Sequence, residues 1–171
     1  MKKAELVIFD MDGLMFDTGQ LSYRAYLESA KHFDFTVNHY VYYYLTGRTD
    51  SDIREKMREL YGEDAPISEW RDKINLIRKR ILSEEKRVFK KKGLLELLEF
   101  LKNNNYKIAL ASSSSREKIE YYFKIEDMPD IFDIIVAGDE VNAGKPNPEI
   151  FLKACEKANV MPEHALVLED S

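Results

Sequence analysis

Four short apolar runs along the chain predict buried β-strands. They are residues 5–10 (ELVIFD), 107–112 (KIALAS), 133–138 (DIIVAG) and 165–170 (ALVLED). Their apolar residues do not alternate cleanly with polar ones, a pattern typical of strands that are covered on both faces in a parallel sheet.

Helical patterns separate the last three runs. Residues 92–102 carry leucines at helical spacing,. Ser114, followed three residues later by Glu117, predicts a capping box, and Asn147 with Pro148 predicts an N-cap and a first helical position,. Strands that alternate with helices predict an α/β fold, a Rossmann-like parallel sheet with helices on both faces.

Far more residues separate the first two runs than one crossover needs. Residues 20–86 are mostly compatible with helix, so we expect an inserted helical domain at residues 17–86 and a core domain built from residues 1–16 and 87–171. The insertion holds a group of tyrosines, and we expect them to form a small helical core. They are Tyr40, Tyr42, Tyr43 and Tyr44.

Composition and charge argue against several classes of function. The 171 residues are 44% hydrophobic, enough for a sizeable core, and the net charge of -5 offers no general attraction for nucleic acid or anionic membranes,. Cys155 is the single cysteine, which excludes an internal disulfide, and we find no apolar run long enough to span a membrane,. We expect a cytoplasmic protein, a monomer or weak dimer.

Polar residues stand at or near the ends of the predicted strands. Ligands of open α/β sheets bind outside the carboxyl ends of the strands, so these residues are expected to meet at one edge. The residues among them that could take part in catalysis or metal binding are Asp10, Asp12, Ser112, Lys145, Glu169 and Asp170.

Several carboxylates with one lysine cannot stay charged in a single cleft unless a cation joins them. Hard oxygen ligands favour Mg²⁺, and Mg²⁺ indicates a phosphate as its partner. Asp10 can then attack phosphorus, Asp12 can carry a proton, and Lys145 can supply a second positive charge. Gly13 fits a tight turn or a close approach to a ligand.

The sequence also resembles the haloacid dehalogenase superfamily. The residues that carry the resemblance are Asp10-x-Asp12-Gly13, Ser112 after an apolar run, Lys145-Pro146-x-Pro148, and Glu169-Asp170, in this order. The stretches GKPNPEIF and LVLEDS resemble its phosphoglycolate phosphatase and β-phosphoglucomutase-like branch.

The resemblance implies a role for each matching residue. Asp10 would be the nucleophile and a Mg²⁺ ligand, and Asp12 the general acid and base with its main-chain carbonyl on the metal. Ser112 would donate to the phosphoryl group and Lys145 would bridge nucleophile and phosphate. Asp170 and Glu169 would complete the metal site.

The insertion resembles the helical cap of this branch, which closes over a small phosphorylated metabolite and sets specificity. Within it, Arg48 in TGRTDSD is the best candidate for a substrate contact, because a guanidinium binds a second anionic group with two hydrogen bonds,. A surface role or a pairing with Asp50 or Asp52 is the alternative. Gly13 and Ser113 are expected beside the bound phosphate.

Three functions remain open. Hydrolysis of a phosphate monoester is favoured. A sugar-phosphate mutase is disfavoured because Ser22 stands where mutases of the branch carry a histidine, and a hydroxyl does not titrate near neutral pH,. A third possibility, an inactive phosphate-binding remnant, follows from the end of the chain at Ser171, where relatives continue; we expect part of the core domain to be missing there.

Overall fold

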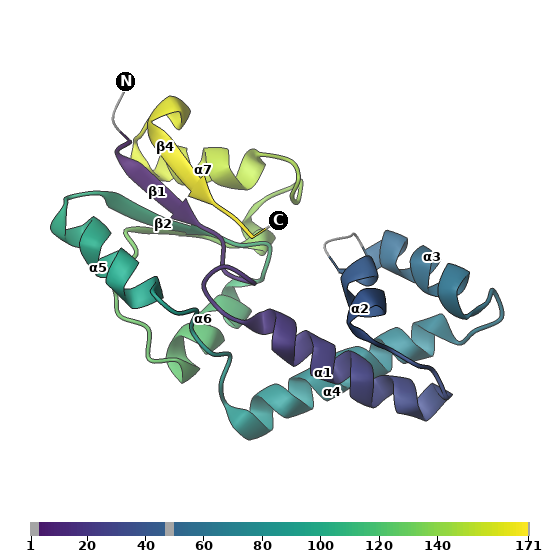
Figure 1. The fold of residues 1–171 in the computed structure, drawn as a ribbon. Helices are drawn as coiled ribbons and strands as arrows, with labels where there is room; N and C mark the ends of the chain where they lie inside the picture. Colours follow the sequence, from purple (N-terminus) through teal and green to yellow (C-terminus); the bar gives the residue numbers. More distant parts are fainter. Residues whose placement is uncertain (1–3, 47–49, 171) are drawn as a thin grey trace. The chain divides into compact units, whose positions relative to one another are not determined.

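The computed structural model describes residues 4–46 and 50–170, and the chain forms two compact units. The first comprises the N-terminal segment up to Thr18 together with Arg87–Asp170, and the second comprises Gly19–Lys86. Both are drawn in Figure 1.

The first unit is built on a four-stranded parallel sheet, so the predicted α/β fold is confirmed. Its strands, in the spatial order β3-β2-β1-β4, are β1 (Leu6–Phe9), β2 (Lys107–Ala111), β3 (Ile134–Val136) and β4 (Ala165–Leu168). Each lies within one of the four apolar runs of the sequence. The polar residues that close those runs lie beyond the strands, at the carboxyl edge of the sheet.

Helices cover both faces of this sheet (Figure 1). They are α5 (Leu94–Asn103), α6 (Arg116–Ile125) and α7 (Glu149–Ala158), with the short 3₁₀ turns η2 (Gly138–Glu140) and η3 (Pro162–His164). Alternate strand residues such as Leu6, Ile8 and Ala109 pack against Ile150 and Ala154 of α7 in one buried cluster. The period of two along each strand therefore places the remaining strand residues on the opposite face.

Two helix starts differ from the prediction by one residue. Ser115, and not Ser114, is the N-cap of α6, because its hydroxyl accepts a hydrogen bond from the backbone N–H of Lys118. Pro148, and not Asn147, is the N-cap of α7, while Asn147 Oδ1 accepts from the N–H of Glu149. The first shift leaves the side chain of Ser114 available for another contact.

The strand β4 departs from the pattern of a fully covered strand. Within the described part of the chain it pairs with β1 and no other strand, and Leu166 and Val167 are 49% and 38% exposed. By contrast, β1 is buried along its whole length. No helix within residues 4–46 and 50–170 has both the length and the apolar character needed to span a bilayer.

The second unit is helical. Its elements are α1 (Thr18–Ala30), η1 (Lys31–Phe33), α2 (His39–Leu45), α3 (Asp50–Tyr61) and α4 (Ile67–Glu85). Trp70 of α4 is fully buried at its centre, where the indole N–H donates to Ser29 Oγ at 2.9 Å and the rings of Phe35 and Tyr61 pack against it. Pairs such as Arg24 with Glu85 tie α1 to the end of α4.

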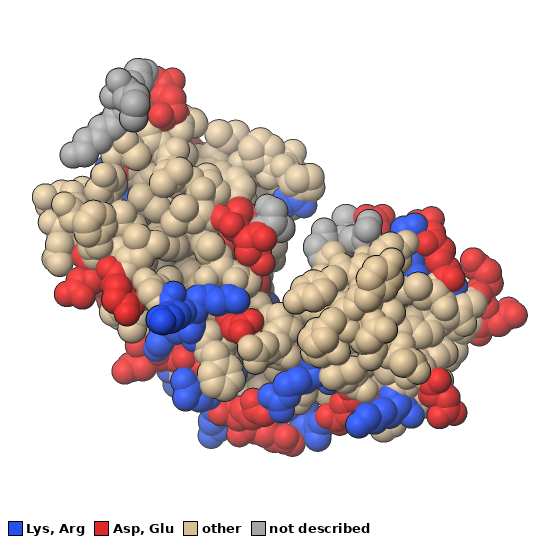
Figure 2. All heavy atoms as spheres, in the orientation of Figure 1, with Lys and Arg blue, Asp and Glu red and all other residues tan. Residues whose placement is uncertain are grey.

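The tyrosine group behaves differently from the prediction. Tyr42 is buried and donates to the carbonyl of Gly19, but Tyr40 and Tyr43 are 76% and 70% exposed. The predicted aromatic core is therefore wrong for these two residues, because a seven-residue helix packs only one face. Figure 2 shows a largely uncharged surface over α2.

Candidate functional site

The parallel register places three predicted site residues side by side. Phe9 at the end of β1 is level with Leu110 of β2 and Leu168 of β4. Asp10 follows Phe9, and its backbone N–H donates to the carbonyl of Leu168 at 3.0 Å. Glu169 directly follows Leu168, and Ser112 follows Leu110 after one intervening residue, so both lie with Asp10 at the carboxyl edge of the sheet,.

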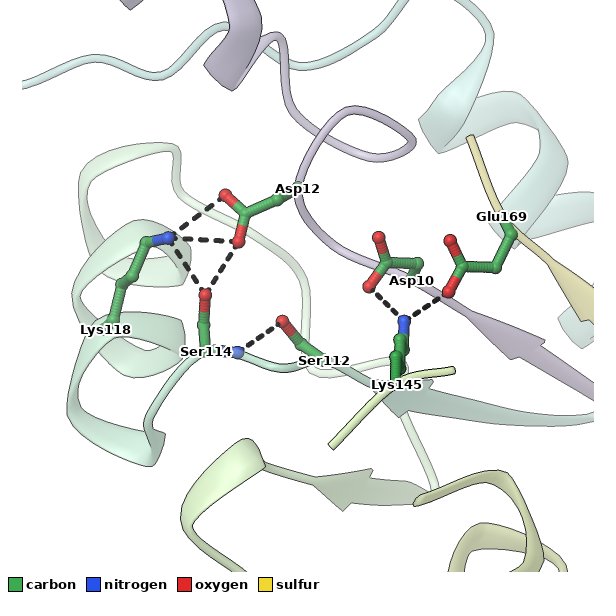
Figure 3. Close-up of polar contacts among 7 residues, drawn as sticks. All are labelled: Asp10, Asp12, Ser112, Ser114, Lys118, Lys145 and Glu169. Carbon is green, nitrogen blue, oxygen red and sulfur yellow. Dashed lines mark hydrogen bonds and ion pairs between the residues drawn. The ribbon is translucent and has the colours of Figure 1, made fainter. Parts of the chain in front are cut away.

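Asp10 and Glu169 share one cation. Lys145, from the segment between β3 and α7, donates to Asp10 Oδ1 at 2.8 Å and also to Glu169 Oε1, as Figure 3 shows. Its ammonium group lies 4.9 Å from the centre of the Phe151 ring. One ammonium thus bridges two carboxylates while an aromatic face covers another side of it.

Asp10 is only 7% exposed, and burial raises the pKa of its carboxyl above the ordinary value. The hydrogen bond and the charge of Lys145 act in the opposite direction without cancelling the effect of burial. Burial therefore destabilises the anionic form of Asp10, and a further positive charge beside the carboxylate would stabilise that form.

Three carboxylates could hold such a charge. Oxygen atoms of Asp10, Glu169 and Asp170 all lie within 4.8 Å of one another. An all-oxygen set of this kind suits a hard cation such as Mg²⁺. The burial of Asp10 and the single lysine shared by the group agree with this choice of donors, so the residues present fit the predicted metal. Figure 2 shows acidic side chains at the surface beside the C-terminal end of β4.

Gly13 makes room for this group. Its φ of +87° lies in the left-handed region, and its N–H donates to the carbonyl of Phe16 in a tight turn after β1. A Cβ at this position would lie 1.8 Å from Asp170 Oδ2. Glycine is therefore required here for two reasons: backbone conformation and the approach of the Asp170 carboxylate.

Asp12 engages a different set of partners. Lys118 Nζ, from the first turn of α6, lies 3.2 Å from Asp12 Oδ1 and 3.0 Å from Oδ2. Ser114 Oγ donates to Asp12 Oδ2 at 2.7 Å. Figure 3 shows the carboxylate of Asp12 turned toward these two side chains, and that of Asp10 turned toward Lys145.

Ser112 is almost fully buried, with 1% of its surface exposed. Its hydroxyl accepts a hydrogen bond from the backbone N–H of Ser114 at 3.1 Å, and its own N–H donates to Val136 of β3. This fixes the turn between β2 and α6. The neighbouring Ser113 is exposed.

The structure thus brings together most of the residues singled out from the sequence. They are Asp10, Asp12, Gly13, Ser112, Lys145, Glu169 and Asp170, whereas Ser113 is exposed and its predicted contact with a bound phosphate stays a prediction. Arg48 lies outside the described residues, so its predicted substrate contact stays a prediction. Lys118 was missed. The sequence signal that could have found it is its spacing of four residues from Ser114, one turn along a helix that begins directly after the β2 edge.

Comparison with known proteins places the chain in one family. A family model described as "Haloacid dehalogenase-like hydrolase" matches residues 7–171. A phosphorylated carbohydrates phosphatase from Thermotoga maritima is 38% identical, over 98% of this chain and 76% of that protein.

Two solved structures have a fold similar to that of this chain. A Thermotoga maritima protein provisionally named a β-phosphoglucomutase superimposes with a TM-score of 0.76 at 32% identity, over 98% of this chain and 76% of that chain. The protein CbbY from Rhodobacter sphaeroides, solved in complex with xylulose-(1,5)bisphosphate, superimposes with a TM-score of 0.70 at 26% identity, over 98% of this chain and 78% of that chain.

Proposed function

Since this chain belongs to the haloacid dehalogenase-like hydrolases, we propose that it is a Mg²⁺-dependent phosphatase that hydrolyses a small phosphorylated metabolite through an aspartyl-phosphate on Asp10. The family and the class of enzyme predicted from the motifs are confirmed by these matches. One observation carries the finer proposal: Lys145 and two further carboxylates, those of Glu169 and Asp170, lie beside the buried carboxylate of Asp10.

Asp10 is suited to act as the nucleophile. Its carboxylate oxygen would attack phosphorus, and the bond from phosphorus to the leaving oxygen would break, so that the phosphoryl group is transferred to Asp10. Lys145 already contacts Asp10 Oδ1 and is placed to follow the phosphoryl oxygens as negative charge moves onto them,. The buried hydroxyl of Ser112 is the proposed donor to the same group.

Asp12 is the proposed general acid and base. In the first step it would give a proton to the leaving oxygen. In the second step it would take a proton from the water molecule whose oxygen attacks phosphorus, which releases phosphate and restores Asp10. Among the described residues its carboxylate contacts Ser114 and Lys118 but neither Lys145 nor the metal-binding group, so it is held apart from the atoms assigned to the nucleophile and the metal.

The proposed Mg²⁺ would be held by Asp10, Glu169 and Asp170, together with the main-chain carbonyl of Asp12. When bound, the ion would neutralise both the carboxylates and the phosphoryl oxygens. Gly13 supports this site because a side chain there would displace Asp170.

The proposed substrate is a sugar phosphate or a similarly compact monoester. The relative from Thermotoga maritima is named for phosphorylated carbohydrates, and CbbY was solved with a sugar bisphosphate. A sugar-phosphate mutase is the second candidate, favoured by the similarity to the protein named a β-phosphoglucomutase. Ser22, at the position where mutases carry a histidine, favours hydrolysis.

Phosphate release tests the proposal. The chain would be assayed on 4-nitrophenyl phosphate and on hexose phosphates, with Mg²⁺ or with EDTA. We expect release that requires Mg²⁺ and falls roughly a thousandfold or more in Asp10→Asn, since removal of a nucleophile has effects of that size or larger. Asp130→Asn, an exposed position of the same unit, serves as the matched control and should keep full activity.

Three outcomes would count against the proposal. If Asp10→Asn were as active as the wild type, Asp10 would not be the nucleophile. If activity were the same in EDTA, the reaction would not require a metal. Isomerisation of a hexose phosphate that depends on added bisphosphate, with little phosphate released, would establish the mutase instead.

A further inference from the structure

The site contains two ammonium groups that serve different carboxylates. Lys145 contacts Asp10 and Glu169, whereas Lys118 contacts Asp12 (Figure 3). The motifs provide only the first of these lysines. The second therefore needs an explanation of its own.

The contacts of Lys118 form a closed network. Its Nζ lies 3.2 Å and 3.0 Å from the two Asp12 oxygens and 2.9 Å from Ser114 Oγ, and that hydroxyl in turn donates to Asp12 Oδ2 at 2.7 Å. An ammonium group has three protons, which is enough for all three contacts at once. Both oxygens of Asp12 are engaged, so the network fixes the orientation of the carboxylate as well as its position.

Lys118 is anchored to a helix, whereas Asp12 lies on a loop. The backbone N–H of Lys118 donates to the N-cap Ser115. Its ammonium group also lies 5.1 Å from the ring centre of Tyr122, which is buried and packs edge-on against Phe16. Lys118 is therefore held from two sides, by its place in the first turn of α6 and by the buried ring of Tyr122 beneath its ammonium group.

We propose that Lys118, together with Ser114, is the positioning residue of Asp12: it keeps that carboxylate apart from Asp10 and from the metal-binding group, where it can reach the leaving oxygen. This inference rests on the proposed phosphatase function. It goes beyond the motifs, because no motif residue supplies this contact.

Two simpler roles predict different kinetics. Lys118 is 40% exposed, so an ordinary surface ion pair would leave catalysis unchanged on removal,. If Lys118 contacted the substrate phosphate directly, its removal would lower kcat/KM by the same factor for all substrates. A positioning role toward the general acid affects only substrates whose leaving oxygen needs a proton.

The test replaces the ammonium group and keeps the length of the side chain. We would measure kcat/KM of Lys118→Met with Mg²⁺ on 4-nitrophenyl phosphate, whose leaving group departs without a proton, and on an alkyl phosphate, whose leaving group needs one. We expect kcat/KM to fall about tenfold or more on the alkyl phosphate, a fraction of the range for general acid catalysis, and less than about twofold on the aryl phosphate.

Two further variants complete the kinetic test. Lys118→Arg should restore part of the lost rate, since a guanidinium also binds both carboxylate oxygens. Lys124→Met, at an exposed position in the last turn of the same helix, should match the wild type on both substrates. An equal loss on the two substrates, or no loss on either, would overturn the proposal.

A double variant tests whether Lys118 acts through Asp12. Asp12→Asn with Lys118→Met should be no slower on the alkyl phosphate than Asp12→Asn alone, since a lysine without its aspartate has nothing to position. Losses that multiply would show that Lys118 acts by another route and would overturn the proposal.

Failure of the phosphatase function is distinguishable from failure of this inference. A wild-type chain that releases phosphate from neither substrate would overturn the function and, with it, the catalytic purpose given to Lys118, whereas an active wild type with an unaffected Lys118→Met would overturn this inference alone. Urea unfolding of the wild type, the two single variants and the double variant tests separately whether Lys118 and Asp12 form a fixed pair. Coupling between the two substitutions would support the fixed pairing, and simple additivity would overturn it.

Discussion

At the scale of single residues, the two aspartates of Asp10-Met11-Asp12 lie in different surroundings although one residue separates them. If the extended geometry of β1 continued, residues two apart would point the same way. The strand ends at Phe9, and the chain turns tightly at Gly13, directly after Asp12. Asp10 thus meets Lys145, and Asp12 meets Lys118.

Gly13 gives a prediction at this scale. In Gly13→Ala, the positive φ should cost about 1–2 kcal/mol of stability, and the new Cβ should displace the carboxylate of Asp170,. We expect Mg²⁺-dependent phosphate release to fall at least about tenfold at low Mg²⁺ and to recover partly at high Mg²⁺. A Mg²⁺ titration of the activity measures this.

Gly93→Ala separates the two effects. Gly93 has the same φ of +87°, but a Cβ there would meet no atom within 4 Å. This variant should lose similar stability and keep its Mg²⁺ dependence. A matching change in Mg²⁺ dependence in both variants would show that backbone strain, and not the position of Asp170, is responsible.

At the scale of secondary-structure elements, Glu140 of η2 connects α6 with α7. Its carboxylate accepts from Lys157 of α7 and Arg116 of α6, and from the N–H of Ala137. The hydrogen bond from Lys157 is the largest cause that lowers the pKa of Glu140 from 4.5 to about 2, with further contributions from Ala137 and Arg116.

This pairing predicts a pH dependence of stability. The folded-state pKa of Glu140 lies below the ordinary value, so the contribution is fully present above about pH 4.5 and is lost as pH falls toward 2,. After allowance for solvent screening we expect about 1–2 kcal/mol. In Glu140→Gln, urea unfolding at pH 7 should show this loss, and the decline toward low pH should be shallower.

Glu120→Gln, at an exposed position on α6, is the control and should follow the wild type at every pH. If the free energy of unfolding fell equally steeply toward low pH in Glu140→Gln and in the wild type, the acid sensitivity would come from other carboxylates.

A second carboxylate holds the segment that returns from the helical unit. Glu126, at the end of α6, is buried and accepts from the backbone N–H groups of Val88 and Phe89. Burial acts to raise the pKa of Glu126, but these two hydrogen bonds and the charges of Arg87 and Lys90 outweigh it, so the pKa is lowered. Its charge is therefore compensated chiefly by main-chain donors.

At the scale of the whole molecule, stability should depend on the proposed metal. A ligand that binds only the folded chain at one hundred times its dissociation constant adds about 2.7 kcal/mol. For a chain of this size we expect Mg²⁺ to raise the Tm by roughly 5–10 °C relative to EDTA at constant ionic strength. Differential scanning calorimetry measures the shift.

Asp170→Asn provides the control, because it removes one of the three grouped carboxylates while the strands stay intact. Its Tm should respond to Mg²⁺ much less than that of the wild type. A wild-type Tm that is the same with Mg²⁺ and with EDTA would contradict metal binding by this group.

The sequence by itself determined the α/β core, the strand segments and most of the residues that meet at the sheet edge. Buried parallel strands are recognisable as short apolar runs, and the polar residues that follow them must gather because parallel strands end at one edge. These features depend on local order along the chain. The family motifs added the proposed role of each residue.

Only the tertiary structure decided the partners of individual side chains. Lys118 meets Asp12 across 106 positions of sequence, and Ser115 takes the cap that leaves Ser114 for the same network. The exposure of Tyr40 and Tyr43 likewise depends on which face of α2 is packed. Such contacts join distant segments whose mutual placement is set by packing of the whole unit, and a local pattern such as the spacing of Ser114 and Lys118 indicates a candidate residue but not its partner.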